Sequence, residues 1–263
     1  MSQPIYVADA FTSKPFRGNP AAVCPLTEPR PEAWMRSVAA EMNLSETAFL
    51  LPESDGFRLR WLTLMVEVAL CGHATLASAH ILWETKRAQL DKPIRFYTRS
   101  GELSASLLNE GIELDFPRRD VKRIDPPADL VEALGVRPLF IGTAGGDVLC
   151  ELESEAVVRA VTPDFAKLAR IDARGIIITA RGTDCGMDFV SRFFAPASGI
   201  NEDPVTGSAH CALAPFWAER LGGHEFTAFQ ASARGGVLGV RLVDDRVKLV
   251  GRAVTVWRGE LVV

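Results

Sequence analysis

Long hydrophobic runs are missing from this chain of 263 residues. The longest apolar stretch, residues 62–70, contains Glu67 and is much shorter than the roughly 20 residues that a membrane-spanning helix needs. The N-terminus has neither the basic nor the apolar segment of a secretory signal. We therefore predict a cytoplasmic protein that does not enter a membrane.

Clusters of basic residues are also missing. The formal net charge is −4 and the isoelectric point is about 5.7. A protein that follows a phosphate backbone needs a basic patch, and none is visible in this sequence. We expect no nucleic-acid partner.

Cysteine pairs with metal-binding or redox spacing are absent. The five cysteines are an odd number and form no CxxC motif, which is typical of reduced thiols in the cytoplasm. His80 and Glu84 lie one helical turn apart, but two ligands do not make a metal site, so we predict no metal. Residues 142–146 are glycine-rich without the Lys-Ser/Thr ending of a nucleotide-binding loop. The cysteines are Cys24, Cys71, Cys150, Cys185 and Cys211.

The composition is that of an ordinary globular protein with a hydrophobic core: 48% of the residues are hydrophobic and 24% are charged. Alternating runs predict strands in two groups. The first group is 5–10, 58–64, 94–98, 103–108 and 111–116, and the second is 139–142, 148–152, 176–179, 189–194, 237–242 and 247–250. Helical spacing occurs at 31–41, 75–86, 127–134 and 210–221. Clustered strands with few helices favour an α+β fold. A charged segment bounded by prolines, residues 117–127, is the expected linker. It divides the chain into an N-terminal half, residues 1–117, and a C-terminal half, residues 118–263.

An internal repeat supports this division. Residues 67–79 align without a gap on residues 202–214, so that Glu67 matches Glu202 and Gly72 matches Gly207. Residues 60–63 resemble residues 192–195 upstream. The repeat predicts a duplicated chain with two similar halves around a pseudo-twofold axis. Small-molecule sites are common where such halves face each other, so we expect the site there.

In both copies a glycine precedes an alanine-rich helix. The first backbone N–H groups of a helix lack partners within it, and the helix dipole favours an anion there. Gly72 and Gly207 could therefore bind a carboxylate, or they could simply allow a tight turn into each helix. Alanine-rich helices are thin, which suits burial inside a wrapped sheet.

Four segments resemble the PhzF-like isomerase family of phenazine biosynthesis, in the same order and over nearly the whole chain. A weaker fifth segment is Arg234-Gly235-Gly236. The four segments are residues 8–24, 41–49 (EMNLSETAF), 70–77 (LCGHATLA) and 202–210 (EDPVTGSAH).

The resemblance implies a diaminopimelate-epimerase-like fold: two halves, each a curled β-sheet wrapped round a central helix, with a last strand that can cross back to the first half. It also implies proton transfer without a cofactor, and a homodimer. Glu46 matches the glutamate that moves a proton within a dihydro-hydroxyanthranilate in the phenazine enzyme. The supporting positions are His73, Asp203 and Ser208, with Gly72 and Gly207 as carboxylate-binding backbone positions.

The sequence departs from relatives of this family at two positions. Leu64 stands where many members have proline, so the loop before Glu67 can differ in shape. Related epimerases and racemases use two cysteines, one in each half. Cys71 occupies the first of these positions, but Thr206 occupies the second. We therefore do not expect a racemase with two thiols.

Glu46 and His73 are the candidate proton-transfer residues. Glu46 is followed by an apolar run, and a carboxyl group beside apolar walls holds its proton more tightly, which suits a general acid/base. The alternative is a solvent-facing glutamate. His73 is expected in the first turn of a helix, where the dipole disfavours a protonated imidazole, so we expect a neutral ring that orients the substrate or relays a proton.

The other candidates have structural alternatives of similar weight. Asp203 is the third predicted catalytic residue: it could hold a substrate amine or hydroxyl or pair with His73 across the expected cleft, or it could simply cap a helix. Ser208 could bind a carboxylate or be an ordinary first-turn serine. Asn19 could bind substrate or form a turn.

Together these features predict an isomerase that needs no cofactor and acts on a small carboxylate by general acid/base proton transfer. Two alternatives remain open: a one-base epimerase or racemase of an amino or hydroxy acid, and an interaction protein that has kept the scaffold without turnover.

Overall fold

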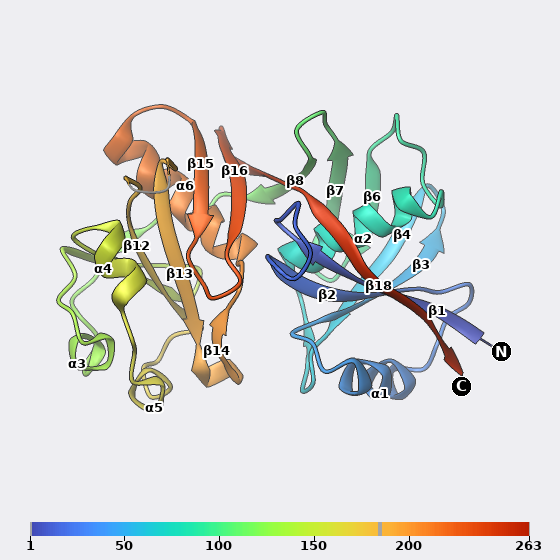
Figure 1. Ribbon diagram of the computed structural model, residues 1–263, viewed down its shortest axis with the longest axis horizontal. Coiled ribbons are helices and arrows are strands. Elements are labelled where there is room, and N and C mark those ends of the chain that lie inside the picture. The colour runs from blue at the N-terminus through green and yellow to red at the C-terminus, as the bar shows by residue number, and fades with distance from the viewer. Residues whose placement is uncertain (1, 184–185, 263) are drawn as a thin grey trace. The chain divides into compact units, whose positions relative to one another are not determined.

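The computed structural model describes residues 2–183 and 186–262, so Cys185 lies outside the described residues. The chain divides into two units (Figure 1). Unit 1 consists of Met1–Asp115 and Val250–Val263, and unit 2 consists of Phe116–Leu249. The chain therefore enters unit 2 once and returns to unit 1 for its last strand.

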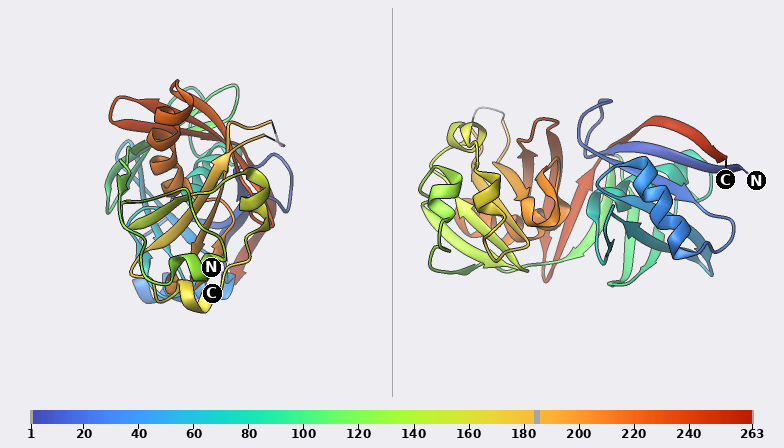
Figure 2. Two further views of the ribbon diagram at one scale, coloured as in Figure 1. Left: turned by 90° about the vertical axis from the view of Figure 1, so that its left-hand side faces the viewer. Right: turned by 90° about the horizontal axis from the view of Figure 1, so that it is seen from below.

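Unit 1 is a sheet with one helix inside and one outside. Its last strand pairs along the first, as Figure 2 also shows. The elements are β1 (Ser2–Ala10), β2 (Asn19–Pro25), α1 (Glu32–Met42), β3 (Thr47–Glu53), β4 (Gly56–Leu62), β5 (Glu67–Val68), α2 (Gly72–Glu84), β6 (Ile94–Thr98), β7 (Gly101–Leu107), β8 (Ile112–Pro117) and β18 (Ala253–Val262).

Unit 2 has the same kind of construction, with short helices between its second and third long strands. Its elements are β9 (Lys122–Arg123), α3 (Leu130–Leu134), β10 (Phe140–Ala144), β11 (Asp147–Glu151), α4 (Glu155–Ala160), α5 (Phe165–Leu168), β12 (Gly175–Arg181), β13 (Phe189–Ala195), η1 (Pro196–Ser198), β14 (Ile200–Asp203), α6 (Gly207–Leu221), β15 (Glu225–Gln230), β16 (Gly236–Val243) and β17 (Arg246–Gly251).

The two units pair their strands in the same order. In unit 1, β1–β2 is antiparallel, β2–β3 parallel, β3–β4 and β4–β5 antiparallel, β4–β6 parallel and β6–β7 antiparallel. Unit 2 repeats this series with β10–β11, β11–β12, β12–β13, β13–β14, β13–β15 and β15–β16. The sequence repeat thus corresponds to a repeat of strand order and direction.

A matched ion pair also recurs. Arg60 on β4 binds both carboxylate oxygens of Glu67 on β5, at 2.9 and 2.6 Å. Arg192 on β13 binds both oxygens of Glu202 on β14, at 2.7 and 3.0 Å. Each pair ties a long strand to the short strand that leads into a helix, and two parallel N–H···O bonds fix that approach geometrically.

The helix inside each unit is apolar on nearly all sides. In α2, the side chains of Ala74, Ala77 and Ala79 have no exposed surface, and the helix packs against β1, β2, β3 and β18. Helix α6 is buried in the same way through most of its first three turns. Small side chains let the sheet approach these helices closely. The predicted α+β fold, with a curled sheet around a central helix, is confirmed.

Several predicted boundaries were wrong. The helices expected at 75–86 and 210–221 begin one turn earlier, at Gly72 and Gly207, because apolar periodicity does not register the small first-turn residues. The expected linker contains the short strand β9, in which Arg123 pairs with Gly142 of β10. Strands β2 and β3 were missed because both of their faces are largely buried, which removes the alternation that marks a strand.

No helix among the described residues is long and apolar enough to span a membrane.

Candidate functional site

Two predicted site residues of unit 1, Glu46 and His73, meet Cys71 at the start of α2. Glu46 directly precedes β3, and its backbone carbonyl accepts a hydrogen bond from the Ala22 N–H at 3.3 Å. Cys71 is the last residue before α2, and His73 is the second residue of the helix. Strand pairing and the helix start therefore determine where all three side chains begin.

The imidazole of His73 lies between a carboxylate and a thiol. Its Nε2 is 3.2 Å from Oε2 of Glu46, and its Nδ1 is 3.6 Å from Sγ of Cys71. His73 and Cys71 are buried, and the Glu46 side chain is 13% exposed. Neither Oε2 of Glu46 nor Nε2 of His73 makes a hydrogen bond of good geometry within the described residues. These two buried atoms therefore have each other as their nearest polar neighbours on the facing side.

The neighbours of His73 decide its charge. Burial works against a protonated ring, yet the Cys71 sulfur and the Glu46 carboxylate raise the pKa of His73 well above its ordinary value. The expectation of a neutral His73, based on the helix dipole, was therefore wrong. A full carboxylate charge at 3.2 Å outweighs the partial charge of a helix end.

Cys71 behaves differently from a reactive thiol. Burial raises the pKa of the Cys71 thiol, and the negative charge of Glu46 raises it further. A raised pKa disfavours the thiolate, which is the reactive form of a thiol.

The same three side chains are the group that could hold a metal ion, since their ligand atoms lie within 4.8 Å of one another. His73, however, presents one ring nitrogen to the sulfur and the other to the carboxylate. An ion bound to His73 could use only one of these nitrogens, so it would have to break one of the two contacts. The arrangement suits a carboxylate–imidazole pair better than a metal cage.

The predicted residues of unit 2 form a separate network at the start of α6. Asp203 ends β14, and its Oδ2 accepts a short hydrogen bond from the hydroxyl of Thr206, the residue before α6. Gln230 of β15 accepts from the Thr206 N–H at 2.8 Å and donates to the Asp203 carbonyl at 2.7 Å. Thr206 thus occupies the second thiol position of the related racemases with its hydroxyl already engaged.

Ser208 and Gly207 lie one step further along. Gly207 begins α6, and Ser208 accepts a hydrogen bond at Oγ from Nη2 of Arg174 at 3.0 Å. Asn19 is in unit 1, where it is fully buried as the first residue of β2 and pairs opposite Ala10. It is therefore a strand residue and not the turn residue of the alternative interpretation.

Sequence reasoning missed Gln230 and Arg174. Gln230 is a fully buried polar residue at the end of a strand that the alternation did not reveal. A lone polar residue between Phe229 and Ala231 was the available signal. Arg174 gave no signal, because its contact with Ser208 spans 34 residues of sequence.

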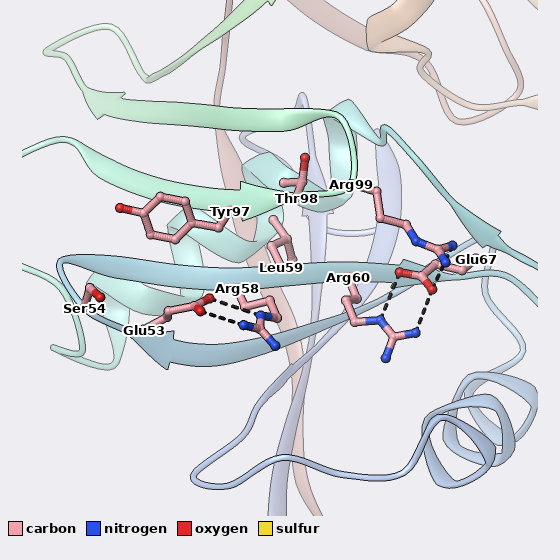
Figure 3. Close-up of a pocket in the computed structure, with 9 residues that line it drawn as sticks. All are labelled: Glu53, Ser54, Arg58, Leu59, Arg60, Glu67, Tyr97, Thr98 and Arg99. Carbon is pink, nitrogen blue, oxygen red and sulfur yellow. Dashed lines mark hydrogen bonds and ion pairs between the residues drawn. The ribbon is translucent and has the colours of Figure 1, made fainter.

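A groove of about 640 Å³ also lies in unit 1 (Figure 3). Its three arginines are already paired: Arg58 with Glu53, and Arg60 and Arg99 with Glu67. None of the predicted site residues lines this groove, so we do not place the site there. Its lining consists of Glu53, Ser54, Arg58, Leu59, Arg60, Glu67, Tyr97, Thr98 and Arg99.

The repeated sheet-and-helix fold, with a buried carboxylate–imidazole pair where a central helix starts, defines a protein equipped for general acid/base chemistry. Residues 8–259 match the family model described as phenazine biosynthesis-like protein. The chain belongs to this phenazine biosynthesis-like family.

Individual relatives agree over their whole lengths. A protein of Halalkalibacterium halodurans, named as an uncharacterized isomerase, is 55% identical over 99% of both chains. Another of that kind, from Pseudomonas aeruginosa, is 48% identical over 99% of both chains. The crystal structure of a PhzF-family protein from Enterococcus faecalis matches with a TM-score of 0.95 and 41% identity over 100% of both chains. The predictions of the family and of an isomerase are confirmed.

Proposed function

We propose that this protein is an isomerase that moves a proton within a small carboxylate without a cofactor, and that Glu46 is its acid/base. The observation that carries the proposal is the buried pair of Glu46 and His73, at 3.2 Å, with no competing hydrogen bond on the facing atoms. In this proposal a protonated His73, which its raised pKa favours, faces the carboxylate of Glu46 that accepts the proton of the substrate.

The proton transfer needs only this one carboxylate. Glu46 removes a proton from a substrate carbon, and the electron pair of the broken C–H bond enters the adjacent conjugated system. The carboxylic acid formed on Glu46 then returns the proton to another carbon of that system, so the double bond migrates and Glu46 is regenerated. His73 holds the carboxylate in place through both steps.

The remaining predicted residues bind the substrate in this proposal. The backbone at Gly72 and Gly207 and the hydroxyl of Ser208 bind carboxylate oxygens, since helix starts offer N–H groups and a favourable dipole. Asp203 and Asn19 bind amino or hydroxyl groups. The substrate is therefore a small carboxylate that carries a polar substituent and a conjugated system. The homodimer and the cytoplasmic location stay predictions.

The substitution Glu46→Gln tests the role of the carboxylate. A panel of small unsaturated amino and hydroxy carboxylates is incubated with the enzyme in D2O and followed by proton NMR. We expect wild type to convert at least one member with migration of a double bond, and Glu46→Gln to lose about 100-fold or more of that rate, the usual worth of a general acid/base.

The chain offers a matched control for this test. Glu84 lies on α2 with Oε2 at 3.4 Å from Nε2 of His80, a second glutamate–histidine pair that is more exposed. Glu84→Gln should turn over like wild type. Full turnover by a folded Glu46→Gln would remove Glu46 from the mechanism. Inversion at one carbon without migration of a double bond would instead indicate an epimerase.

A further inference from the structure

A second charged cluster lies in unit 2, where β11 and β12 start side by side. Asp147 is the first residue of β11 and pairs with Gly175, the first residue of the parallel strand β12. Arg174 directly precedes β12, and its backbone N–H donates to the Gly146 carbonyl at 2.7 Å. Parallel pairing therefore brings Asp147 and Arg174 together at one end of the sheet.

The carboxylate of Asp147 is buried and bound on one side. The side chain of Asp147 is 1% exposed, and its Oδ2 forms a short ion pair with Nη2 of Arg174. Oδ1 of the same carboxylate has no hydrogen-bond partner within the described residues. Burying a carboxylate with one oxygen unsatisfied costs stability, which a purely structural ion pair would avoid.

Arg174, which Asp147 holds, also contacts Ser208. The same Nη2 donates to Oγ of Ser208 at 3.0 Å, and the guanidinium lies over the ring of Phe193 at 5.4 Å from its centroid. A guanidinium can only donate, so the hydroxyl oxygen of Ser208 acts as acceptor and its O–H remains to donate elsewhere. The carbonyl one turn back, that of Pro204, already accepts from Ser232 at 2.8 Å.

At equivalent positions of the repeat, the two units have side chains of opposite charge facing the start of the central helix. In unit 1, the segment before β3 supplies Glu46, which contacts His73, the second residue of α2. In unit 2, the segment before β12 supplies Arg174, which contacts Ser208, the second residue of α6. A negative side chain faces the first helix start, and a positive one faces the second.

We propose that Arg174, held by Asp147, is the residue that makes the start of α6 selective for a carboxylate. The Arg174 guanidinium, the hydroxyl of Ser208 and the first N–H groups of α6 all donate, and only an acceptor with negative charge satisfies them together. Arg174 sets the direction of the Ser208 hydroxyl, and Asp147 is a positioning residue for Arg174. This inference rests on the proposed function of Ser208 as a carboxylate-binding residue.

Binding of benzoate and of its neutral analogue benzamide tests the proposal. Titrations of the full chain are followed through the backbone amide signals of Gly207 and Ser208 by NMR. We expect benzoate to shift these signals in wild type at lower concentration than benzamide. Arg174→Gln should weaken benzoate binding about tenfold or more while it leaves benzamide unchanged, because the lost bonds are charge-assisted. Arg174→Lys should restore part of the preference.

A matched pair in the same unit provides the control. Glu155 is buried with a side chain that is 0% exposed, and its partner Arg159 is 41% exposed, much as Arg174 is 43% exposed beside Asp147. Arg159→Gln should not change either affinity. Asp147→Asn should lower the preference for benzoate by loosening Arg174, while the thermal midpoint shows that the variant is folded.

Three outcomes would overturn the inference: benzoate that fails to shift these amides in wild type, an Arg174→Gln variant that binds benzoate as wild type does, or an equal loss of benzoate and benzamide. Glu46→Gln should bind benzoate normally. If Glu46→Gln still turned over substrate while Arg174→Gln bound benzoate weakly, only the proposed function would be rejected. If Glu46→Gln lost turnover while Arg174→Gln bound benzoate as wild type does, only the inference about Arg174 would be rejected.

Discussion

His73 shows how a single residue obtains its chemistry from its neighbours. The sequence places it in the first turn of a helix, and that position alone predicts a neutral ring. The neighbouring Glu46 cannot be located from local sequence, because 27 positions and three strands separate it from His73 along the chain. Its charge reverses the prediction. Glu46, His73, Asp203 and Ser208 were nevertheless found through the motif resemblance.

The charge of His73 can be measured directly. The chain has four histidines, so ring NMR signals can be assigned with single substitutions. We expect His73 to titrate well above pH 6.5 and His210 near pH 4. In Glu46→Gln the pKa of His73 should fall, because burial then opposes the charge with less compensation. A wild-type His73 that titrates below pH 6.5 would contradict this account of the pair.

Other residues of the sites were beyond sequence reasoning. Asp147 begins β11 and Arg174 directly precedes β12, and their contact depends on the parallel register of these two strands. The sequence of neither strand indicates which strand it pairs with. Residue types are visible in a sequence, whereas the register that brings them together is a property of the folded sheet.

At the scale of elements, helix α6 combines a structural role with the binding role proposed for its start. Its start carries Gly207 and Ser208, while His210 is fully buried one turn into the helix, with Nδ1 at 2.9 Å from the carbonyl of Thr206. The ring of His210 also stacks on Phe189 at 6.0 Å between centroids. These contacts are those of a residue with a structural role.

The burial of His210 predicts a pH dependence of stability. Burial lowers the pKa of His210 from 6.5 to about 4. Between pH 6.5 and pH 4, the unfolded chain binds a proton at His210 whereas the folded chain does not. The free energy of unfolding therefore decreases as the pH falls, by about 3 kcal/mol at most.

His210→Asn keeps a hydrogen-bonding group near Nδ1 but does not titrate. Urea unfolding measured from pH 7 to pH 4 should therefore show a weaker pH dependence for His210→Asn than for wild type. Parallel curves for the two proteins would rule out His210 as the source of this dependence.

Element boundaries were predictable where periodicity is strong. The strand at Ile94–Thr98 was predicted with its observed ends, because one face is buried and the other is not. Strand β18 was missed because its side chains are mostly half-exposed or exposed, so that burial does not impose a pattern on its sequence. Its position depends on pairing with β1, at the opposite end of the sequence.

At the scale of the whole chain, one strand order is used twice while the chemistry has diverged. The Arg60–Glu67 and Arg192–Glu202 pairs are alike in both units, which marks them as parts of the shared framework. The helix starts differ: Cys71 and His73 in unit 1 correspond to Thr206 and Ser208 in unit 2. The framework residues could be identified from the sequence because they are the same in both copies of the repeat. The residues that differ between the copies are those to which we assign the proposed functions.

The fate of the transferred hydrogen tests the central claim that one carboxyl group carries the proton. A substrate from the panel is labelled with deuterium at the carbon that loses hydrogen and is converted in ordinary water. The Glu46 side chain is only 13% exposed, so the account predicts that part of the deuterium appears at the new carbon in the first product formed. Product that is free of deuterium from the first turnover onward would contradict it.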